Sequence, residues 1–434
     1  MVRISERRPP TPTLALFGIS ALSLGLQAII IFVPSQGLWG PDGDTYVGIA
    51  ERMRWPLDVV GPDLGDENYW AIGYPLFLRF LDVFPWSGLL FVTLVQSGLL
   101  IGTALAAYKI ASPLREPFRV ATFALVALSP SLLFASRVIG YESLLAFLLT
   151  TALFLLLRVQ RQSSKALVSL VLAGVCLGIA TWVQSKVLVL APVFILTMFV
   201  GRPFVNGLVR AMWFLAGFLV PLLLLAGRNA LVHDRFSPVT DNAAINAWIG
   251  NSPESSGRYM AVYFPPDWRE TLLERIGAFA LDSPRDFVTL QVRKVVELFV
   301  PTRERPDFGF AVLDLSIEAL QFAWLLCLAL GLGLYISGLA FRVLGRATEL
   351  WPVALTCLVG LLTHVPFIAD ARMRLPYEPM LIVLSVAVAS VTLARWRDSR
   401  SDEDCPGVDC RTSASGSSHS AVHVKKTSSD VSSP

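Results

Sequence analysis

The chain has 434 residues, of which 54% are hydrophobic and only 16% are charged, and its mean hydropathy is +0.59. This composition is too apolar for an ordinary soluble protein and indicates a membrane protein that contacts the lipid bilayer directly. The net charge of +3 is small and gives no indication of a nucleic-acid partner.

Ten apolar segments, taken in chain order, predict ten transmembrane helices. A helix needs about 20 apolar residues to cross a hydrocarbon core about 30 Å thick, or slightly fewer where flanking residues snorkel. Helices are expected because every backbone group in lipid must be satisfied within its own segment. The fold class is therefore an all-α polytopic membrane protein, with spans at 14–33, 87–108, 120–136, 143–157, 166–183, 187–200, 211–227, 319–341, 350–369 and 375–393.

The first span could be confused with a cleaved signal peptide. It is longer than a signal core, and no small-residue cleavage site follows it, so we expect it to remain as an anchor. Only residues 184–186 separate the fifth span from the sixth, which is short.

Basic residues mark every second connection between the spans. Short loops on the cytoplasmic side of a membrane collect Lys and Arg, so both termini are expected in the cytoplasm and two long loops, about 34–86 and 228–318, outside. The transmembrane module is expected to cover residues 1–395. Residues 396–434 are rich in Ser and poor in large apolar residues, which predicts a disordered cytoplasmic tail. The basic residues are Arg3, Arg7, Arg8, Lys109, Arg115, Arg119, Arg158, Arg161, Lys165, Arg202, Arg210, Arg342, Arg346, Arg395, Arg397 and Arg400.

The second outer loop is expected to be folded rather than a tether. Residues 267–280 and 283–299 both have the apolar spacing of helices. In the latter segment, Ser283 can cap the helix, Pro284 suits the first helical position and Asp286 completes a capping-box pattern.

Arg372 and Arg374 break the charge pattern, because they stand in a very short outer connection, ADARMRLPYEPM. Guanidinium groups match phosphate oxygens, so this pair is a candidate site for a phosphate at the membrane surface. The alternative is that they pair with Asp370 and Glu378 and only close the loop. Two further basic residues fall at outer span ends and are candidate contributors: Lys186 and Arg137.

Asp42 and Asp44 follow the first span directly, in the stretch LWGPDGDTYVGIAERM. A carboxylate just outside the bilayer and next to a cationic phosphate site can act as general base toward an acceptor hydroxyl or amine. Gly43 frees the backbone there, and Tyr46 begins an amphipathic turn. The alternative is an ordinary solvated acidic loop.

Two further ionisable residues lie near the same outer edge. Glu142, in GYESLLAF, is expected either to orient substrate or to pair with Arg137. His364, in LLTHVPF, is an ionisable group near the outer end of the ninth span and hence a functional candidate. The alternative is a neutral histidine hydrogen-bonded between helices.

Six stretches of the chain resemble the GT-C superfamily of integral-membrane glycosyltransferases. The resemblance is strongest to bacterial relatives of the dolichyl-phosphate-mannose protein mannosyltransferases, which are of the glycosyltransferase family 39 type. It covers most of the chain except the tail, in the same order relative to the spans. The stretches are GPDGDTYVGIAERM, GYPLFLRFL, YESLLAFLLTTALFLLLR, CLGIATWVQSK, TDNAAINAWIGNSP and RMRLPYEPMLIVL.

The resemblance implies a GT-C-like helix bundle that transfers a hexose or pentose from a polyprenyl-phosphate carrier to a glycan, lipid or protein acceptor. It places the active site on the outer, periplasmic or extracellular face of a bacterial inner or plasma membrane. In the family, the catalytic acidic residue precedes an aromatic residue by four places. Asp42 matches this spacing to Tyr46, with Asp44 close by. Many relatives have Asp followed by Glu instead of Asp-Gly-Asp, so the base stays open between the two carboxylates.

The resemblance also assigns the late arginines, here Arg372 and Arg374, to the phosphate of the lipid-linked donor. It makes GYPLFLRFL a short helix lying on the membrane. No Walker loop or dinucleotide glycine fingerprint occurs, which disfavours a nucleotide-sugar donor. We expect no required cofactor, with a divalent metal held by Asp42 and Asp44 as the alternative.

Two other functions are compatible with the same residues. In a transporter or flippase for a lipid-linked sugar, the outer arginines would bind phosphate without any chemistry, although transport sites are expected near the midplane in broken helices. In a non-catalytic membrane scaffold, removal of these charges would have no effect.

Overall fold

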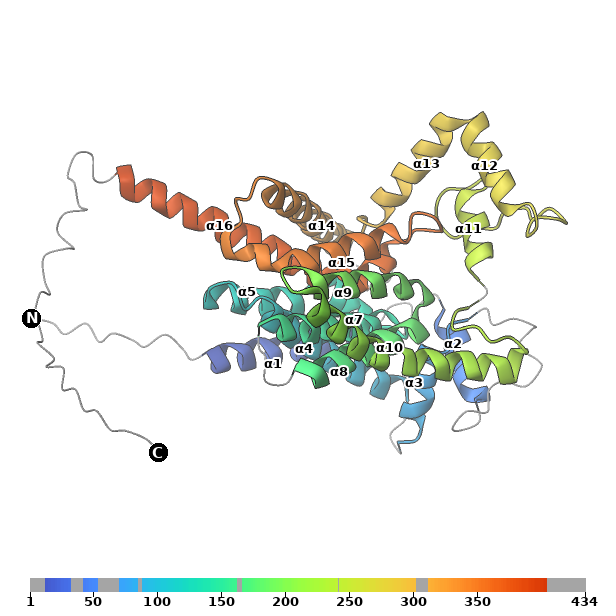
Figure 1. The fold of residues 1–434 in the computed structure, drawn as a ribbon, viewed down its shortest axis with the longest axis horizontal. Coiled ribbons are helices and arrows are strands. Elements are labelled where there is room, and N and C mark those ends of the chain that lie inside the picture. The colour runs from blue at the N-terminus through green and yellow to red at the C-terminus, as the bar shows by residue number, and fades with distance from the viewer. Residues whose placement is uncertain are drawn as a thin grey trace, which may run out of the picture. The chain divides into compact units, whose positions relative to one another are not determined.

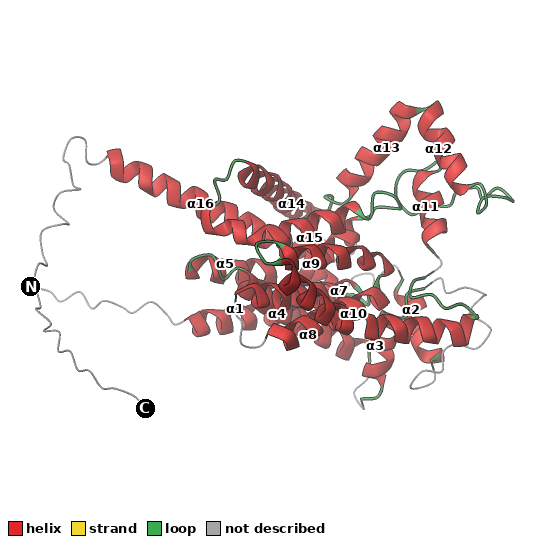
Figure 2. Cartoon of the chain, in the orientation of Figure 1, coloured by secondary structure: helices red, strands yellow, loops and turns green. Residues whose placement is uncertain are grey.

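The computed structural model describes residues 12–32, 42–53, 70–84, 88–161, 166–240, 242–301 and 311–403. Helices are the only regular elements in these ranges (Figures 1 and 2), which confirms the predicted all-α class. They are α1 (Pro12–Phe32), α2 (Gly43–Arg52), α3 (Gly73–Asp82), α4 (Leu89–Ile110), α5 (Glu116–Ala127), α6 (Pro130–Arg137), α7 (Glu142–Arg161), α8 (Ala166–Val183), η2 (Ser185–Val189), α9 (Leu190–Phe199), α10 (Phe204–His233), α11 (Ala243–Asn251), α12 (Leu272–Asp282), α13 (Pro284–Glu297), α14 (Ala311–Ala340), η3 (Gly345–Leu350), α15 (Trp351–Leu362), η4 (Ala371–Tyr377) and α16 (Glu378–Glu403).

The chain divides into two compact units, Met1–Val391 and Thr392–Pro434. The core and the candidate site belong to the first unit. In the second, the described residues form the last turns of α16, so 396–403 are helical. The rest of the predicted tail lies outside the described residues, and its disorder stays a prediction.

Each of the ten predicted spans coincides with helical structure, but the count of ten is not confirmed. By length and apolarity, six helices in the described residues qualify as spans, or seven if the bent pair α5 and α6 counts as one. Four predicted spans are shorter or broken: the pair α5 and α6, α8, η2 with α9, and α15.

The break between α5 and α6 bends the chain by 42°. Pro130 has no N–H to continue the helical hydrogen-bond pattern, and Ser129 restarts the helix by accepting a hydrogen bond from the Leu132 N–H at 3.4 Å. The carbonyl left free at Ala127 accepts a hydrogen bond from Ser23 Oγ of α1 at 2.6 Å. This carbonyl is therefore satisfied inside the bundle, as burial in lipid favours.

Close helix contact holds α8 against α10. A Cβ atom added at Gly174 would lie 2.2 Å from the Phe214 carbonyl oxygen, and one added at Gly217 would lie 2.1 Å from the Val171 carbonyl oxygen. Such small residues let backbones approach, which is how membrane helices associate.

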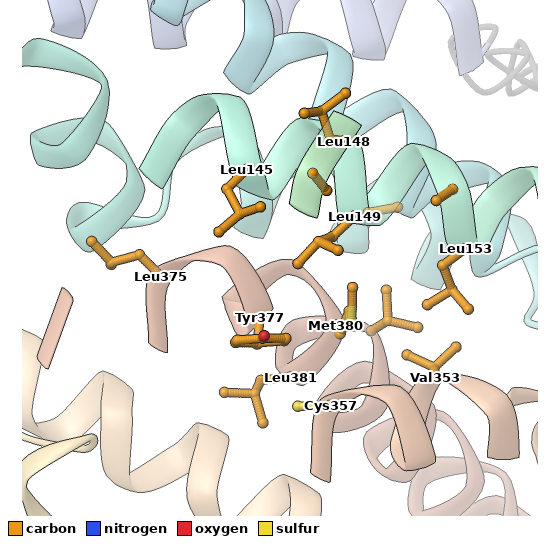
Figure 3. Close-up of a cluster of buried hydrophobic side chains, with 14 of the residues drawn as sticks. Leu145, Leu148, Leu149, Leu153, Val353, Cys357, Leu375, Tyr377, Met380 and Leu381 are labelled. Atoms are coloured by element: carbon orange, nitrogen blue, oxygen red, sulfur yellow. The ribbon is translucent and has the colours of Figure 1, made fainter. Parts of the chain in front are cut away.

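Helix α7 lies at the centre of the core and holds η4 in place. Figure 3 shows Leu145, Leu149 and Leu153 of α7 opposite Tyr377 and Met380, and all five side chains are buried. The element that follows α15 is thereby fixed against the start of α7.

The two long connections that the sequence predicts to lie outside contain helices where they were expected. The amphipathic turn after Asp42 is α2, and GYPLFLRFL forms α3. The two apolar patterns of the second loop form α12 and α13, and Pro284 is the first residue of α13 as predicted. The capping box is wrong, because the Ser283 side chain makes no cap hydrogen bond at its φ of −134° and ψ of 61°.

Candidate active site

Asp42 and Arg372 meet although 330 residues separate them in sequence. Asp42 stands at the start of α2, and its Oδ2 accepts a hydrogen bond from Nη2 of Arg372, which lies on η4. The Asp370 carboxylate accepts a hydrogen bond from the Arg372 backbone N–H at 3.1 Å and so begins η4 at that point. The Asp42 and Arg372 side chains are 21% and 18% exposed, so the pair is not fully enclosed by the protein.

Glu142, the first residue of α7, is a second carboxylate beside Arg372. Its Oε1 lies 3.9 Å from Arg372 Nη1, and its side chain is only 5% exposed. A Cβ atom at Gly140 would lie 2.4 Å from Glu142 Oε2, so glycine is what gives this carboxylate its room. Arg372 therefore lies between two carboxylates from different elements.

An aromatic cluster surrounds Tyr46, whose backbone N–H donates to the Asp42 carbonyl at 3.0 Å. The Tyr46 ring packs edge-on against Trp70, Tyr74 and Tyr141, with ring centroids 5.7, 5.2 and 6.4 Å away. Burial raises the pKa of both Tyr46 and Tyr74 well above the ordinary value, and negative neighbours add to the effect. These phenols therefore stay neutral and position neighbouring groups.

Tyr74 connects this cluster to a hydrogen-bonded chain inside the bundle. Its hydroxyl donates to Gln96 Oε1 at 2.8 Å, and the Gln96 amide donates to the carbonyls of Ser136 and Val138 at 3.1 and 2.8 Å. These hydrogen bonds thus hold the end of α6, where Arg137 lies, and the segment that leads from it to Glu142.

Lys186 and His364 form a second polar group. Lys186 Nζ lies 3.5 Å from His364 Nδ1 and 4.7 Å from the centroid of the Phe367 ring. Burial, together with repulsion from Lys294, lowers the pKa of Lys186 to about 7. The His364 side chain is buried. Its role, functional or structural, stays a prediction.

The two polar groups are joined through Tyr141 and Gln184. The Gln184 side-chain amide donates to the Tyr141 hydroxyl at 3.3 Å. Gln184 immediately precedes η2, on which Lys186 lies, and Tyr141 immediately precedes Glu142. Neither residue was singled out from the sequence, although Gln184 is a polar break between two apolar segments and Tyr141 adjoins a candidate.

Arg374 does not join Arg372. Its side chain is fully buried; Nε lies 3.4 Å from Glu378 Oε2, and Nη1 donates to the carbonyls of Leu298 and Val300. Glu378 also accepts hydrogen bonds from Ser129 Oγ and from Trp324 Nε1. This is the loop-closing alternative considered for Arg374, whereas Arg372 faces Asp42.

The remaining candidates differ in exposure. Asp44 is exposed in the first turn of α2, where a carboxylate favours the helix N-terminus. Arg137 is buried at the end of α6. Within the described ranges, no group of three or more His, Cys, Asp or Glu residues is arranged to hold a metal ion. The metal alternative at Asp42 and Asp44 stays untested.

Comparison with known proteins gives a family match over part of the chain. Residues 78–234 match the model of the family described as dolichyl-phosphate-mannose-protein mannosyltransferase. The match includes Arg137, Glu142 and Lys186, while Asp42 and Arg372 lie outside it. No curated protein sequence matches this chain.

Solved structures with the same fold belong to an archaeal oligosaccharyltransferase. The structure of AglB from Archaeoglobus fulgidus with an inhibitory peptide and a dolichol-phosphate has a TM-score of 0.53 and 14% identity, covering 92% of this chain and 52% of that chain. The apo form of the Archaeoglobus fulgidus enzyme has the same TM-score and identity, with 91% and 52% covered. The chain therefore has a GT-C-like membrane fold and spans about half the length of these structures.

Proposed function

We propose that this protein transfers a sugar from a polyprenyl-phosphate-linked donor to an acceptor at the outer face of the membrane. The observation that carries the proposal is the placement of Arg372 between Asp42 and Glu142 at the ends of the helices. The match to a mannosyltransferase family and the fold shared with an enzyme solved with dolichol-phosphate support the donor class. The alternation of basic loops supports the outer face and cytoplasmic termini.

Each group has a role in one displacement. The acceptor oxygen or nitrogen forms a bond to the anomeric carbon as the bond from that carbon to the phosphate oxygen breaks. The Asp42 carboxylate takes the proton of the acceptor, and the polyprenyl phosphate leaves with the bonding electron pair. Arg372 stabilises the negative charge that develops on this phosphate. Attack from the side opposite the leaving group would invert the configuration at the anomeric carbon.

The ion pair between Asp42 and Arg372 suggests that the donor binds before the acceptor is deprotonated. The guanidinium of Arg372 contacts one carboxylate oxygen of Asp42. A donor phosphate competes for the same guanidinium, so donor binding frees the carboxylate to accept a proton from the acceptor. Glu142, 3.9 Å from the other guanidinium nitrogen, then keeps Arg372 in place.

The donor sugar is proposed to be a hexose or pentose, with mannose as the first choice because of the matched family. The acceptor is a glycan, a lipid or a protein. We include Lys186 as a second contact to the donor phosphate, because Gln184 and Tyr141 connect its helix to Glu142. Arg374 is left out of the donor site, since its guanidinium is enclosed by Glu378 and two carbonyls.

The test is mass spectrometry of lipid extracts and surface glycans from a deletion strain carrying wild type, Asp42→Asn or Asp44→Asn. Asp44 is a matched control, two residues away and exposed. We expect Asp42→Asn to behave like the deletion, with one surface sugar lost and its polyprenyl-phosphate donor accumulated, while Asp44→Asn restores the wild-type profile. The reverse result would move the base to Asp44. Movement of the lipid-linked sugar with no new glycosidic bond would favour a transporter, and full complementation by both variants would favour a scaffold.

A further inference from the structure

Helix α13 of the second outer loop has two opposite faces. Leu290 and Lys294 are buried, whereas Val288, Val292, Val295 and Val296 are exposed. At 3.6 residues per turn, these four valines lie on one side of the helix and the two buried residues lie on the other. We call the four valines the valine face.

The buried face of α13 packs on the end of α11 and on the segment that follows it. Lys294 Nζ donates to Asn251 Oδ1 at 2.7 Å and to the Val365 carbonyl at 2.9 Å. A Cβ atom at Gly257, whose φ of +87° suits glycine, would meet Lys294 and Leu290 side-chain atoms at 2.9 and 3.5 Å. The valine face therefore points away from α11.

The base of α13 is fixed at the level where a membrane span begins. Leu298, just after α13, is buried, and its carbonyl accepts a hydrogen bond from Arg374, four residues before α16 begins at Glu378. In Figure 1, α12 and α13 form a hairpin that projects obliquely from the end of the bundle, and α13 is drawn between α11 and α14. The valine face thus turns toward the membrane side of the hairpin.

Helix α14, the next described helix along the chain, also has an exposed apolar surface. Helix α14 is a candidate span and exposes Leu315, Leu320 and Phe322. Exposed apolar side chains on a helix that lies across the ends of the spans meet the boundary between headgroups and acyl chains, where amphipathic helices bind. Two exposed arginines of α13, Arg285 and Arg293, suit the phosphates of the headgroups.

We propose that α13 lies on the outer surface of the bilayer beside α14, with its valine face inserted among the lipids. Leu281, exposed at the turn between α12 and α13, adds to the inserted surface. The occupant of this face is thus lipid, and the hairpin is a lateral membrane contact outside the spans. This inference does not depend on the proposed reaction.

The test measures the collision of a nitroxide spin label with oxygen, which concentrates in lipid, and with a water-soluble nickel chelate. The full chain, with its five native cysteines replaced by alanine, is reconstituted in phospholipid nanodiscs. Labels are placed singly through Val288→Cys, Val292→Cys and Val295→Cys. Leu320→Cys on α14 is the lipid control, and Asp286→Cys, on the other side of α13, is the water control.

We expect the ratio of oxygen to nickel collisions at the three valine positions to approach that of Leu320→Cys and to exceed that of Asp286→Cys severalfold. A ratio equal to that of Asp286→Cys would overturn the proposal and leave the face to an acceptor or partner protein. A second measurement keeps the native cysteines: the double variant Val288→Asp with Val292→Asp should speed amide exchange of residues 284–297 in nanodiscs severalfold. Unchanged exchange in that variant would also count against lipid contact.

Discussion

The buried pair of Arg374 and Glu378 predicts a specific pattern of stability. Replacing Glu378 by Gln leaves the guanidinium without its anion in a fully enclosed site. Breaking a buried pair by removing one partner costs about 3–5 kcal/mol, because one charge stays uncompensated. Replacing Arg374 by Met leaves the opposite charge and also removes the donor to the carbonyls of Leu298 and Val300, which adds about 1–3 kcal/mol per carbonyl.

The double variant separates these contributions. With both charges gone, only the two carbonyls lack their donor, so Arg374→Met with Glu378→Gln should be more stable than Arg374→Met alone. The assay is the free energy of unfolding in mixed micelles for all four members of the double-mutant cycle. Additive effects of the two substitutions would refute the buried pair. Wild-type stability of Arg374→Met combined with a raised KM for the donor would show that Arg374 contacts the donor phosphate, as the sequence pattern first suggested.

Three further outcomes follow from the structure. Arg372→Met should lower kcat about 10²- to 10³-fold in assays with polyprenyl-phosphate mannose, as loss of one electrostatic stabiliser does, and Arg372→Lys less; a change below threefold would exclude it from the transition state. Because burial lowers the pKa of Lys186 to about 7, the fraction of Lys186 in the protonated, phosphate-binding form declines above that pH. The KM for the donor should therefore rise between pH 7 and 9, by up to about tenfold per pH unit, and Lys186→Arg should abolish this rise. A wild-type KM that does not change with pH would show that Lys186 does not contact the donor. In thermal unfolding, Gly217→Ala should destabilise the protein by about 1–3 kcal/mol, because the added methyl group meets the Val171 carbonyl. The control Gly227→Ala lies on the same helix with no atom within 4 Å of the added methyl group, so it should be neutral or stabilising by up to about 1 kcal/mol. Equal effects of the two substitutions would show that α8 and α10 are not closely packed.

Local patterns were enough to predict the helices next to the site. Each of these patterns depends on only a few neighbouring residues. They are the amphipathic spacing after Asp42, the stretch GYPLFLRFL and the proline that begins α13. The same information does not fix where a span ends. The predicted ninth span ran to residue 369, but α15 stops at Leu362, because the following residues are held by tertiary contacts such as those of Lys294 and Asn251 with the carbonyls of Val365 and Pro366.

The partners of the charged side chains could not be predicted. The position of Arg372 outside the positive-inside pattern marked it as unusual, yet nothing local indicates that it meets Asp42 and Glu142. Glu142 was weighed as a partner of Arg137, which is closer in sequence. The choice depends on how α7 packs against η4, and that packing comes from leucines and aromatic residues spread over both elements.

The 3₁₀ geometry of η4 has a consequence for how this segment can vary. With three residues per turn, the side chains of Arg372 and Arg374 point about 120° apart, so the same turn of backbone sends the first to the carboxylates and the second into the core. Inserting a single residue between Asp370 and Arg372 would rotate both guanidinium groups by about 120° relative to Asp370, and inserting one between the two arginines would change the angle between them. Related chains should therefore tolerate substitutions at several positions of ARMRLPY but keep its length constant.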